Sequence, residues 1–377
     1  MDVSTTTAEP IALDPRRSLI GLISEHRELA IQLAEHLDLL VIESDPLSGT
    51  SVLLSMTLDD ADRPTLAIDA RSTGDALDLA MAIATAAVTR LAPQAASWWN
   101  STSTIDIEGL SLSHALAGQG VNLDDLRLGA GSGTEQLRHA LELAAALSAG
   151  PALVAIDHLD DLLERLNAQA SRELLGALRA DHQRAGSVQQ LLVGRTDGRL
   201  ASALRDPGHP LYRAGPILRV RRPRPQRFID DLAIGRAWTT VPDDVIAAAA
   251  ELAAGAPAYV WRTLDAVTTS TGHPGARVLD AWRHLRQATE PATAQQFRLL
   301  ASTHRAAPTV VCAIALGVGP YELPLNPKSV NDALTRMRAR GQVFSPEKQR
   351  WAVSDPLLGA WAREHAPIWV YRHAHAG

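Results

Sequence analysis

The sequence predicts an α/β protein in which a parallel sheet is sandwiched by helices and followed by a helical lid and a winged-helix domain. Five short apolar runs alternate with helix-like segments over the first 220 residues, the pattern of a parallel sheet covered on both faces. Three helical segments and a hairpin-like stretch close the chain, the order of elements in a winged helix. With 377 residues the chain exceeds one usual core, so we expect several domains.

The elements of the first part follow from apolar runs and helical spacing. Each strand-like run is short and bounded by turn residues, and the first helix has Ser24 as its expected N-cap. We expect strands over residues 39–44, 64–71, 151–157, 188–195 and 216–220, and helices over 24–37, 51–58, 75–92, 133–150 and 159–182. Residues 98–133 are irregular and predict a connection with short elements.

Proline-rich residues 219–226 end this part, and a helical pattern follows. Glu290 and Pro291 are expected to open a last unit. Its helices are expected over 292–303, 308–317 and 327–341, followed by a hairpin over 342–355 and a helix over 355–366. The predicted division is a flexible leader (1–17), an α/β domain (18–226), a helical lid subdomain (227–289) and a winged-helix domain (290–377).

Composition favours a cytoplasmic protein. The N-terminus lacks the basic and apolar order of a signal peptide, and no apolar stretch approaches the roughly 18–20 residues that span a bilayer. The single cysteine, Cys312, excludes an internal disulfide and a cysteine-cluster metal site. Residues 291–377 hold ten of the 36 Lys and Arg and five of the 42 Asp and Glu, so this basic end permits nucleic-acid binding while the acidic remainder does not favour it.

The turn after the first strand occupies the position of a phosphate-binding P-loop. The motif G-x-x-x-x-G-K-[ST] falls on residues 44–51, where Gly49 and Ser51 are retained. Ser44 replaces the first glycine and Thr50 replaces the lysine that brings positive charge to the β- and γ-phosphates. Lys328 and Lys348 are the only lysines in the chain, so none precedes residue 328. We expect weak anion binding by the backbone and the helix N-terminus at most.

The third strand ends in the matching half of such a site. Asp157 stands where a Walker B aspartate orients Mg²⁺, and with Ser51 it forms the expected magnesium position, filled only if nucleotide binds. His158 replaces the acid that usually positions the attacking water. An ordinary loop and an ordinary strand end explain these residues equally well. The glycine-rich run 129–134 follows no clear strand, so we expect a turn that caps the next helix there.

Further segments resemble archaeal-type ATPases and the related initiator-type and STAND members of the AAA class. VQQLLVGRTDGRL (188–200) resembles their sensor-1 strand, with Thr196 at the polar position, and HPLYRAGPILRV (209–220) makes Arg213 the candidate arginine finger. GAPAYVWRTL (255–264) resembles the helix start near sensor 2, with Arg262 as its arginine. The opening SLIGLISEHRELAIQL and the closing WAVSDPLLGAWAR also match, so the resemblance covers about residues 18–366. It implies an AAA-like fold whose ATP-hydrolysing residues are altered here.

The winged helix carries a basic set that suits contact with DNA phosphates. Its members are Lys328, Ser329, Arg336, Arg338, Arg340, Lys348 and Arg350. Arg336 and Arg340 are four residues apart and are expected to share a helix face. A solvated face used for protein contacts explains the same residues, and both interpretations stay open.

The leading hypothesis is a pseudo-ATPase scaffold that binds DNA or a protein partner through its winged helix, with ATP or ADP and Mg²⁺ held weakly or not at all. One alternative is an active nucleotide switch whose neighbouring subunit, through Arg213, supplies the missing charge. Another is a structural subunit with neither ligand. A protein partner or a homo-oligomer is expected in each case, and no membrane.

Overall fold

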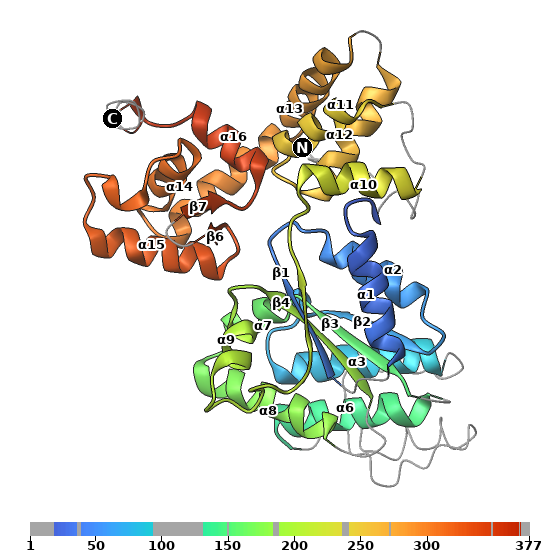
Figure 1. Cartoon of the computed structure of the whole chain (residues 1–377). Coiled ribbons are helices and arrows are strands. Elements are labelled where there is room, and N and C mark those ends of the chain that lie inside the picture. Colours follow the sequence, from blue (N-terminus) through green and yellow to red (C-terminus); the bar gives the residue numbers. More distant parts are fainter. Residues whose placement is uncertain are drawn as a thin grey trace, which may run out of the picture.

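The computed structural model describes residues 19–35, 39–92, 131–148, 151–183, 188–235, 241–270, 273–347, 350–368 and 370. A five-stranded parallel sheet lies at the centre of the first part, in the order β2-β3-β4-β1-β5 (Figure 1). The strands are β1 (Leu39–Ser44), β2 (Thr65–Asp69), β3 (Leu153–Asp157), β4 (Gln189–Arg195) and β5 (Ile217–Val220). All five expected strands are therefore present, and their carboxyl ends meet at one edge.

Helices cover both faces of this sheet, as predicted. They are α1 (Ile23–Ala34), α2 (Thr50–Asp59), α3 (Ala76–Leu91), α6 (Gly133–Leu147), α7 (Leu159–Arg165), α8 (Ala168–His182) and α9 (Arg199–Arg205), with a short 3₁₀ turn at Ala70–Ser72. Val154 and Ile156 of β3 belong to the core under α3, α6 and α8, whereas Leu153 and Ala155 belong to the core under α1 and α2. Successive strand residues alternate between faces, so one strand supplies both cores.

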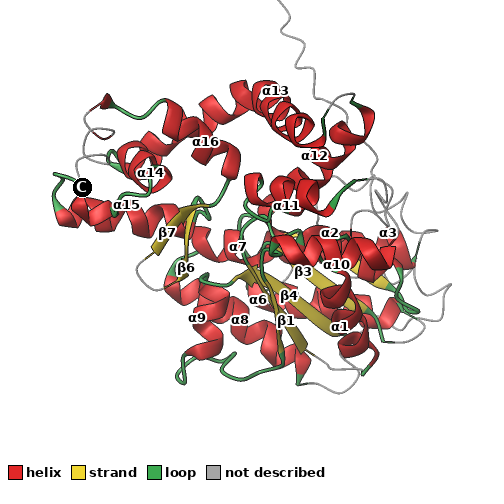
Figure 2. Cartoon of the chain, turned by 45° about the horizontal axis from the view of Figure 1, so that its top comes forward, coloured by secondary structure: helices red, strands yellow, loops and turns green. Residues whose placement is uncertain are grey.

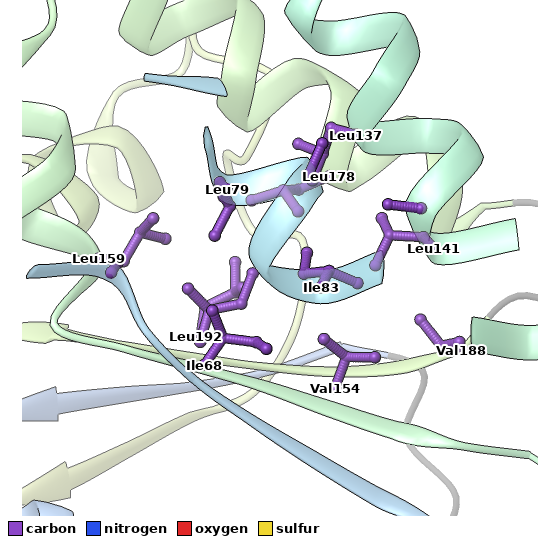
Figure 3. Close-up of a cluster of buried hydrophobic side chains, with 14 of the residues drawn as sticks. Ile68, Leu79, Ile83, Leu137, Leu141, Val154, Leu159, Leu178, Val188 and Leu192 are labelled. Atoms are coloured by element: carbon purple, nitrogen blue, oxygen red, sulfur yellow. The ribbon is translucent and has the colours of Figure 1, made fainter. Parts of the chain in front are cut away.

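The larger core explains why α3 and α6 pack on the sheet. Leu79 and Ile83 of α3 lie over Ile68 and Val154 of the strands (Figure 3), and all four are almost completely buried. Burying side chains of this size contributes about 1.5–3 kcal/mol each. Ser132 caps α6 and forms a capping box with Glu135, which confirms the expected helix cap for the described residues from 131 onward. Residues 129 and 130, like the leader and most of the expected 98–133 connection, lie outside the described ranges.

Two local expectations in this part are wrong. Ser24 does not cap α1, because the helix begins one residue earlier and Leu22 occupies the cap position. Asp231 of a later helix accepts the backbone N–H groups of Gly21 and Ile23 instead, at 2.9 and 3.0 Å. The single helix expected over 159–182 is in fact two helices, because the backbone is extended at Leu166 and Asn167 between them.

A bundle of helices follows the sheet domain, as predicted. It consists of α10 (Pro225–Gly235), α11 (Asp243–Leu252), α12 (Pro257–Thr269) and the long α13 (Pro274–Thr303). The prediction of a separate helix that starts after Pro291 is wrong, because α13 runs through that residue without a break. It contacts α11 and α12 of the bundle and also α14 and α16 of the last part.

The last part is the expected winged helix. It contains α14 (Ala307–Ala315), a 3₁₀ turn (Pro320–Glu322), α15 (Pro327–Ala339), the antiparallel pair β6 (Val343–Glu347) and β7 (Arg350–Val353), and α16 (Pro356–Glu364). Its own core includes the buried Val311, Val330, Leu334 and Met337. The α/β fold with a helical lid and a winged helix is thus confirmed, while the domain limits at 226 and 289 stay predictions. Within the described ranges, no helix combines the length and apolar character that a membrane crossing requires.

Candidate nucleotide-binding site

The turn between β1 and α2 has the backbone of a phosphate-binding loop. Gly49 directly precedes α2 in the left-handed region, with φ of 85°. A Cβ at this position would lie 2.8 Å from a Leu22 methyl group and 3.3 Å from the Pro257 ring, so glycine is required for both conformation and space. The first backbone N–H groups of α2 have no partner within the helix, so they are available to an anion.

The magnesium half of the predicted site is brought together. Ser51 Oγ donates a hydrogen bond of 2.7 Å to Asp157 Oδ2, which joins the first turn of α2 to the end of β3. Hydroxyl and carboxylate oxygens are ligands that Mg²⁺ prefers. Among the described residues, no group of three acidic, histidine or cysteine side chains is placed to hold a metal alone. A magnesium ion at Ser51 and Asp157 would therefore depend on the oxygens of a bound phosphate.

His158 lies against this pair. Its Nε2 is 3.3 Å from Ser51 Oγ and 3.5 Å from Asp157 Oδ2, and its backbone is left-handed, with φ of 56°. Its own N–H donates to Asp157 Oδ1 at 2.8 Å. The imidazole thus holds the serine and the aspartate in place, and it puts no carboxylate where an attacking water would need one.

Thr50 cannot perform the function of the missing lysine. Its side chain is buried, and its hydroxyl lies 2.8 Å from the Ser48 hydroxyl, inside the loop rather than toward a ligand. Ser44 is also tied inward, since its Oγ donates to the Gly194 carbonyl at 3.1 Å. Both altered motif positions therefore stabilise the loop itself and add no positive charge.

A cavity of about 650 Å³ opens at this edge of the sheet, between the loop, the lid and the winged helix. Its charged walls hold four aspartates (Asp45, Asp157, Asp160 and Asp161) and four arginines (Arg71, Arg195, Arg262 and Arg340). The predicted Arg262 is thus at the cavity and exposed. Thr196 is close by but faces the loop, because its hydroxyl donates to Asp45 Oδ1 at 3.1 Å.

Arg213, the candidate arginine finger, lies away from these residues. It is exposed, has a left-handed φ of 51°, and its guanidinium stacks 5.1 Å from the centre of the Tyr212 ring. It is not among the residues that line the cavity. Any contact between Arg213 and a phosphate would therefore have to be made in another copy of the chain.

Two cavity arginines were missed from the sequence, and both are already paired. Arg71 follows β2 and grips Asp69 with Nε and Nη2, which raises the Arg71 pKa and lowers the Asp69 pKa. Arg195 ends β4 and reaches Asp161 and Glu164, at 2.9 Å each. Their position was a usable signal, because ligands of open parallel sheets bind beyond the carboxyl ends of the strands.

The basic set of the winged helix divides in two. Lys328 and Ser329 are at the start of α15 and Arg350 is exposed on β7, whereas Lys348 lies outside the described residues. The other end of α15 faces the rest of the molecule (Figure 2): Arg338 Nε lies 2.5 Å from Asp197 Oδ2, and the Ala339 carbonyl accepts from Arg195. Arg336 and Arg340 both bond Thr303 at the end of α13, which confirms that they share a face.

Arg222 forms a second junction with the winged helix. Its Nε donates to the Pro46 carbonyl of the loop at 2.6 Å, its Nη2 donates to the Ser354 carbonyl, and it stacks 4.9 Å from the centre of the Phe344 ring. Burial lowers the pKa of this guanidinium to about 10, so it stays charged at neutral pH. The loop and the wing are thereby joined by one side chain.

Comparisons with known proteins agree on the fold. The structure is similar to the Walker-type ATPase paby2304 of Pyrococcus abyssi, with a TM-score of 0.62 and 19% identity over 90% of this chain and 95% of that one. It is also similar to the Orc2 protein of Aeropyrum pernix in ADPNP–ADP complexes, with a TM-score of 0.52 and 15% identity over 94% and 93%. No family model and no curated protein matches the sequence. The chain therefore shares its fold with these two archaeal proteins, as the resemblance of its motifs implied.

Proposed function

We propose that this protein is an ATPase-like scaffold that holds a nucleotide without hydrolysing it at an ordinary rate and engages DNA or a protein partner through its winged helix. The observation that carries the proposal is that the loop keeps some side chains of the nucleotide-binding motif and has lost others. The Ser51–Asp157 pair keeps the oxygens that would hold Mg²⁺, at 2.7 Å, while Thr50 turns its hydroxyl to Ser48. Binding groups remain and charge-stabilising groups are lost.

Catalysis of phosphoryl transfer depends mainly on positioning and on positive charge around the transferred group. A neutral, buried Thr50 supplies no charge, and His158 supplies no carboxylate for the attacking water. The fold relatives support the binding half: one is an ATPase by name, and the other was solved with ADPNP and ADP. The residues therefore favour occupancy over turnover.

The first experiment measures thermal unfolding and ATP hydrolysis of the purified chain with Mg-ATP. Binding to the folded state should stabilise it by about 2.7 kcal/mol when the ligand is at a hundred times its Kd. We expect a shift in Tm that Asp157→Ala reduces, without measurable turnover. A turnover on the order of 1 s⁻¹, typical of enzymes, that is abolished in Asp157→Ala would contradict the proposal.

One observation favours a second candidate, a nucleotide switch completed by a neighbouring subunit. Arg213 is exposed and outside its own chain's cavity, so it is free to enter the cavity of another copy. This function predicts oligomers that form only with nucleotide and are lost in Arg213→Ala. A monomer at every nucleotide concentration would contradict the switch and leave the scaffold. Failure to bind nucleotide, DNA or a second copy would favour the purely structural subunit instead.

A further inference from the structure

The four arginines of the nucleotide cavity are not equally available to a ligand. Arg195 is bound to Asp161 and Glu164, and Arg71 is bound to both carboxylate oxygens of Asp69. Within the described chain, Arg262 and Arg340 have no carboxylate partner. The hydrogen bond that Arg340 makes is to the neutral Thr303 hydroxyl, at 2.8 Å, so no carboxylate of the described residues occupies its guanidinium.

Arg340 comes from the winged helix, yet it shares the cavity wall with the loop of residues 44–52 and with Asp157. The residues around Arg340 contact the end of β4 and the turn that follows it. Arg338 pairs with Asp197, and the Ala339 carbonyl accepts from Arg195. Gly341, two residues after the end of α15 and with φ of 64°, lies so close to Arg195 that a Cβ there would be 3.4 Å from Arg195 Cδ. Arg338, Ala339 and Gly341, which flank Arg340, therefore lie against Arg195 and Asp197 and hold Arg340 at the cavity.

We propose that Arg340 binds the phosphates of a nucleoside triphosphate in this cavity and supplies, from the winged helix of the same chain, the positive charge that Thr50 does not. The proposal rests on the proposed function and names one residue for it. Arginine suits the role because its planar guanidinium can bond two phosphate oxygens at once and stays charged at any working pH. The charge would be supplied without a neighbouring subunit. A nucleotide held this way would contact both the loop and the winged helix, and would stabilise the arrangement of the two.

A second cavity on the other side of Arg340 provides the matched control. Arg336 lies one helical turn earlier, bonds the Thr303 carbonyl at 3.3 Å, and lines that second cavity but not the nucleotide cavity. Arg336→Gln thus removes an equal charge from the same helix face without touching the nucleotide cavity. Arg340→Lys keeps the charge and loses the planar, two-point contact.

The experiment measures Mg-ATP, tripolyphosphate and adenosine binding by calorimetry to the full-length wild type, Arg340→Gln, Arg340→Lys and Arg336→Gln. We expect Arg340→Gln to weaken ATP and tripolyphosphate binding about ten- to a hundred-fold, the range of a lost charged hydrogen bond. Adenosine, which has no phosphate, should bind the wild type and Arg340→Gln equally. Arg340→Lys should recover part of the loss, and Arg336→Gln should stay within about two-fold of the wild type.

The outcomes separate this inference from the proposed function. If the wild type binds ATP and Arg340→Gln binds it equally well, the role of Arg340 is wrong and nucleotide binding stands. If Arg336→Gln loses as much as Arg340→Gln, the effect comes from the docking of the winged helix, and the direct contact is again wrong. If the wild type binds neither ATP nor tripolyphosphate, the nucleotide half of the proposed function fails and this inference fails with it.

Discussion

Position 50 shows how one side chain limits the chemistry of a whole turn. Gly49 precedes α2, and Ser51 bonds Asp157, at the positions to which the sequence motif pointed. What the motif did not show is that Thr50 turns inward to Ser48, which closes the turn without a cation. Position 50 therefore lacks the positive charge of the motif's lysine, and a substitution can restore that charge.

Thr50→Lys should tighten Mg-ATP binding about tenfold or more, because a charged hydrogen bond to phosphate contributes about 1.5–3 kcal/mol. The long side chain has to leave the buried position of Thr50 and extend into the cavity, at the cost of the contact with Ser48. Calorimetric titration with Mg-ATP measures the change. Thr50→Gln, which has length without charge, is the control, and equal affinities of the two variants would refute the charge argument.

At the scale of elements, the sequence predicted the strands and missed several features of the helices, among them the break between α7 and α8 and the continuity of α13. The central strands β1, β3 and β4 are short runs buried on both faces, whereas the edge strands β2 and β5 alternate buried and exposed residues, and both patterns can be recognised without knowledge of neighbours. The break between α7 and α8 had a readable signal, since Asn167 accepts the Ala170 N–H as an N-cap. The continuity of α13 through Pro291 had none. A proline inside a helix costs about 3 kcal/mol, and only packing of α13 against helices of both the bundle and the last part explains its persistence.

The same limit applies to the site. Arg71 and Arg195 stand where a sheet of this kind binds ligands, so the order of strands could have pointed to them. Arg340 joins the cavity, and Arg222 bridges the loop to the wing, only because the winged helix packs against the sheet domain, and no local pattern encodes that contact. Long-range docking was thus the unpredictable component.

The start of α16 offers a test of buried charge at this packing interface. Asp355 caps the helix by accepting the Leu357 N–H at 2.8 Å, and the Tyr259 hydroxyl of the lid donates to it at 3.3 Å. Burial raises the Asp355 pKa above its ordinary value of 3.8. Folding therefore favours the protonated carboxyl, so this group stabilises the protein below its unfolded pKa and loses that contribution as pH rises through its folded pKa.

In Asp355→Asn this dependence should vanish, since asparagine keeps the cap and carries no charge. The free energy of unfolding of the variant, minus that of the wild type, should increase from about pH 4 to about pH 7. Urea unfolding at several pH values measures it. Asp75→Asn is the matched control, an exposed N-cap aspartate on α3, and a pH trend as large in that variant would remove burial as the cause.

At the scale of the whole molecule, the face predicted to bind DNA is partly used inside the protein. Arg338 pairs with Asp197 at 2.5 Å, while Lys328 and Arg350 remain exposed. A duplex that used the full basic face would have to displace the Arg338–Asp197 pair. Exposed ion pairs contribute about 0–1 kcal/mol to stability, so breaking the Arg338–Asp197 pair costs little free energy. A mutation that removes the pair should therefore produce a small but measurable change in DNA affinity.

Asp197→Asn should therefore raise the affinity for a short DNA duplex about two- to five-fold, because Arg338 becomes available to a phosphate. The slope of log K against log salt should steepen by about 0.9, the value for one more phosphate contact. Fluorescence anisotropy of a labelled duplex over a salt series measures both. Asp59→Asn, which removes an exposed aspartate at the end of α2, controls for the general change in charge. Equal gains in both variants would show that only net charge matters, and the absence of duplex binding in all three proteins would direct the winged helix to a protein partner.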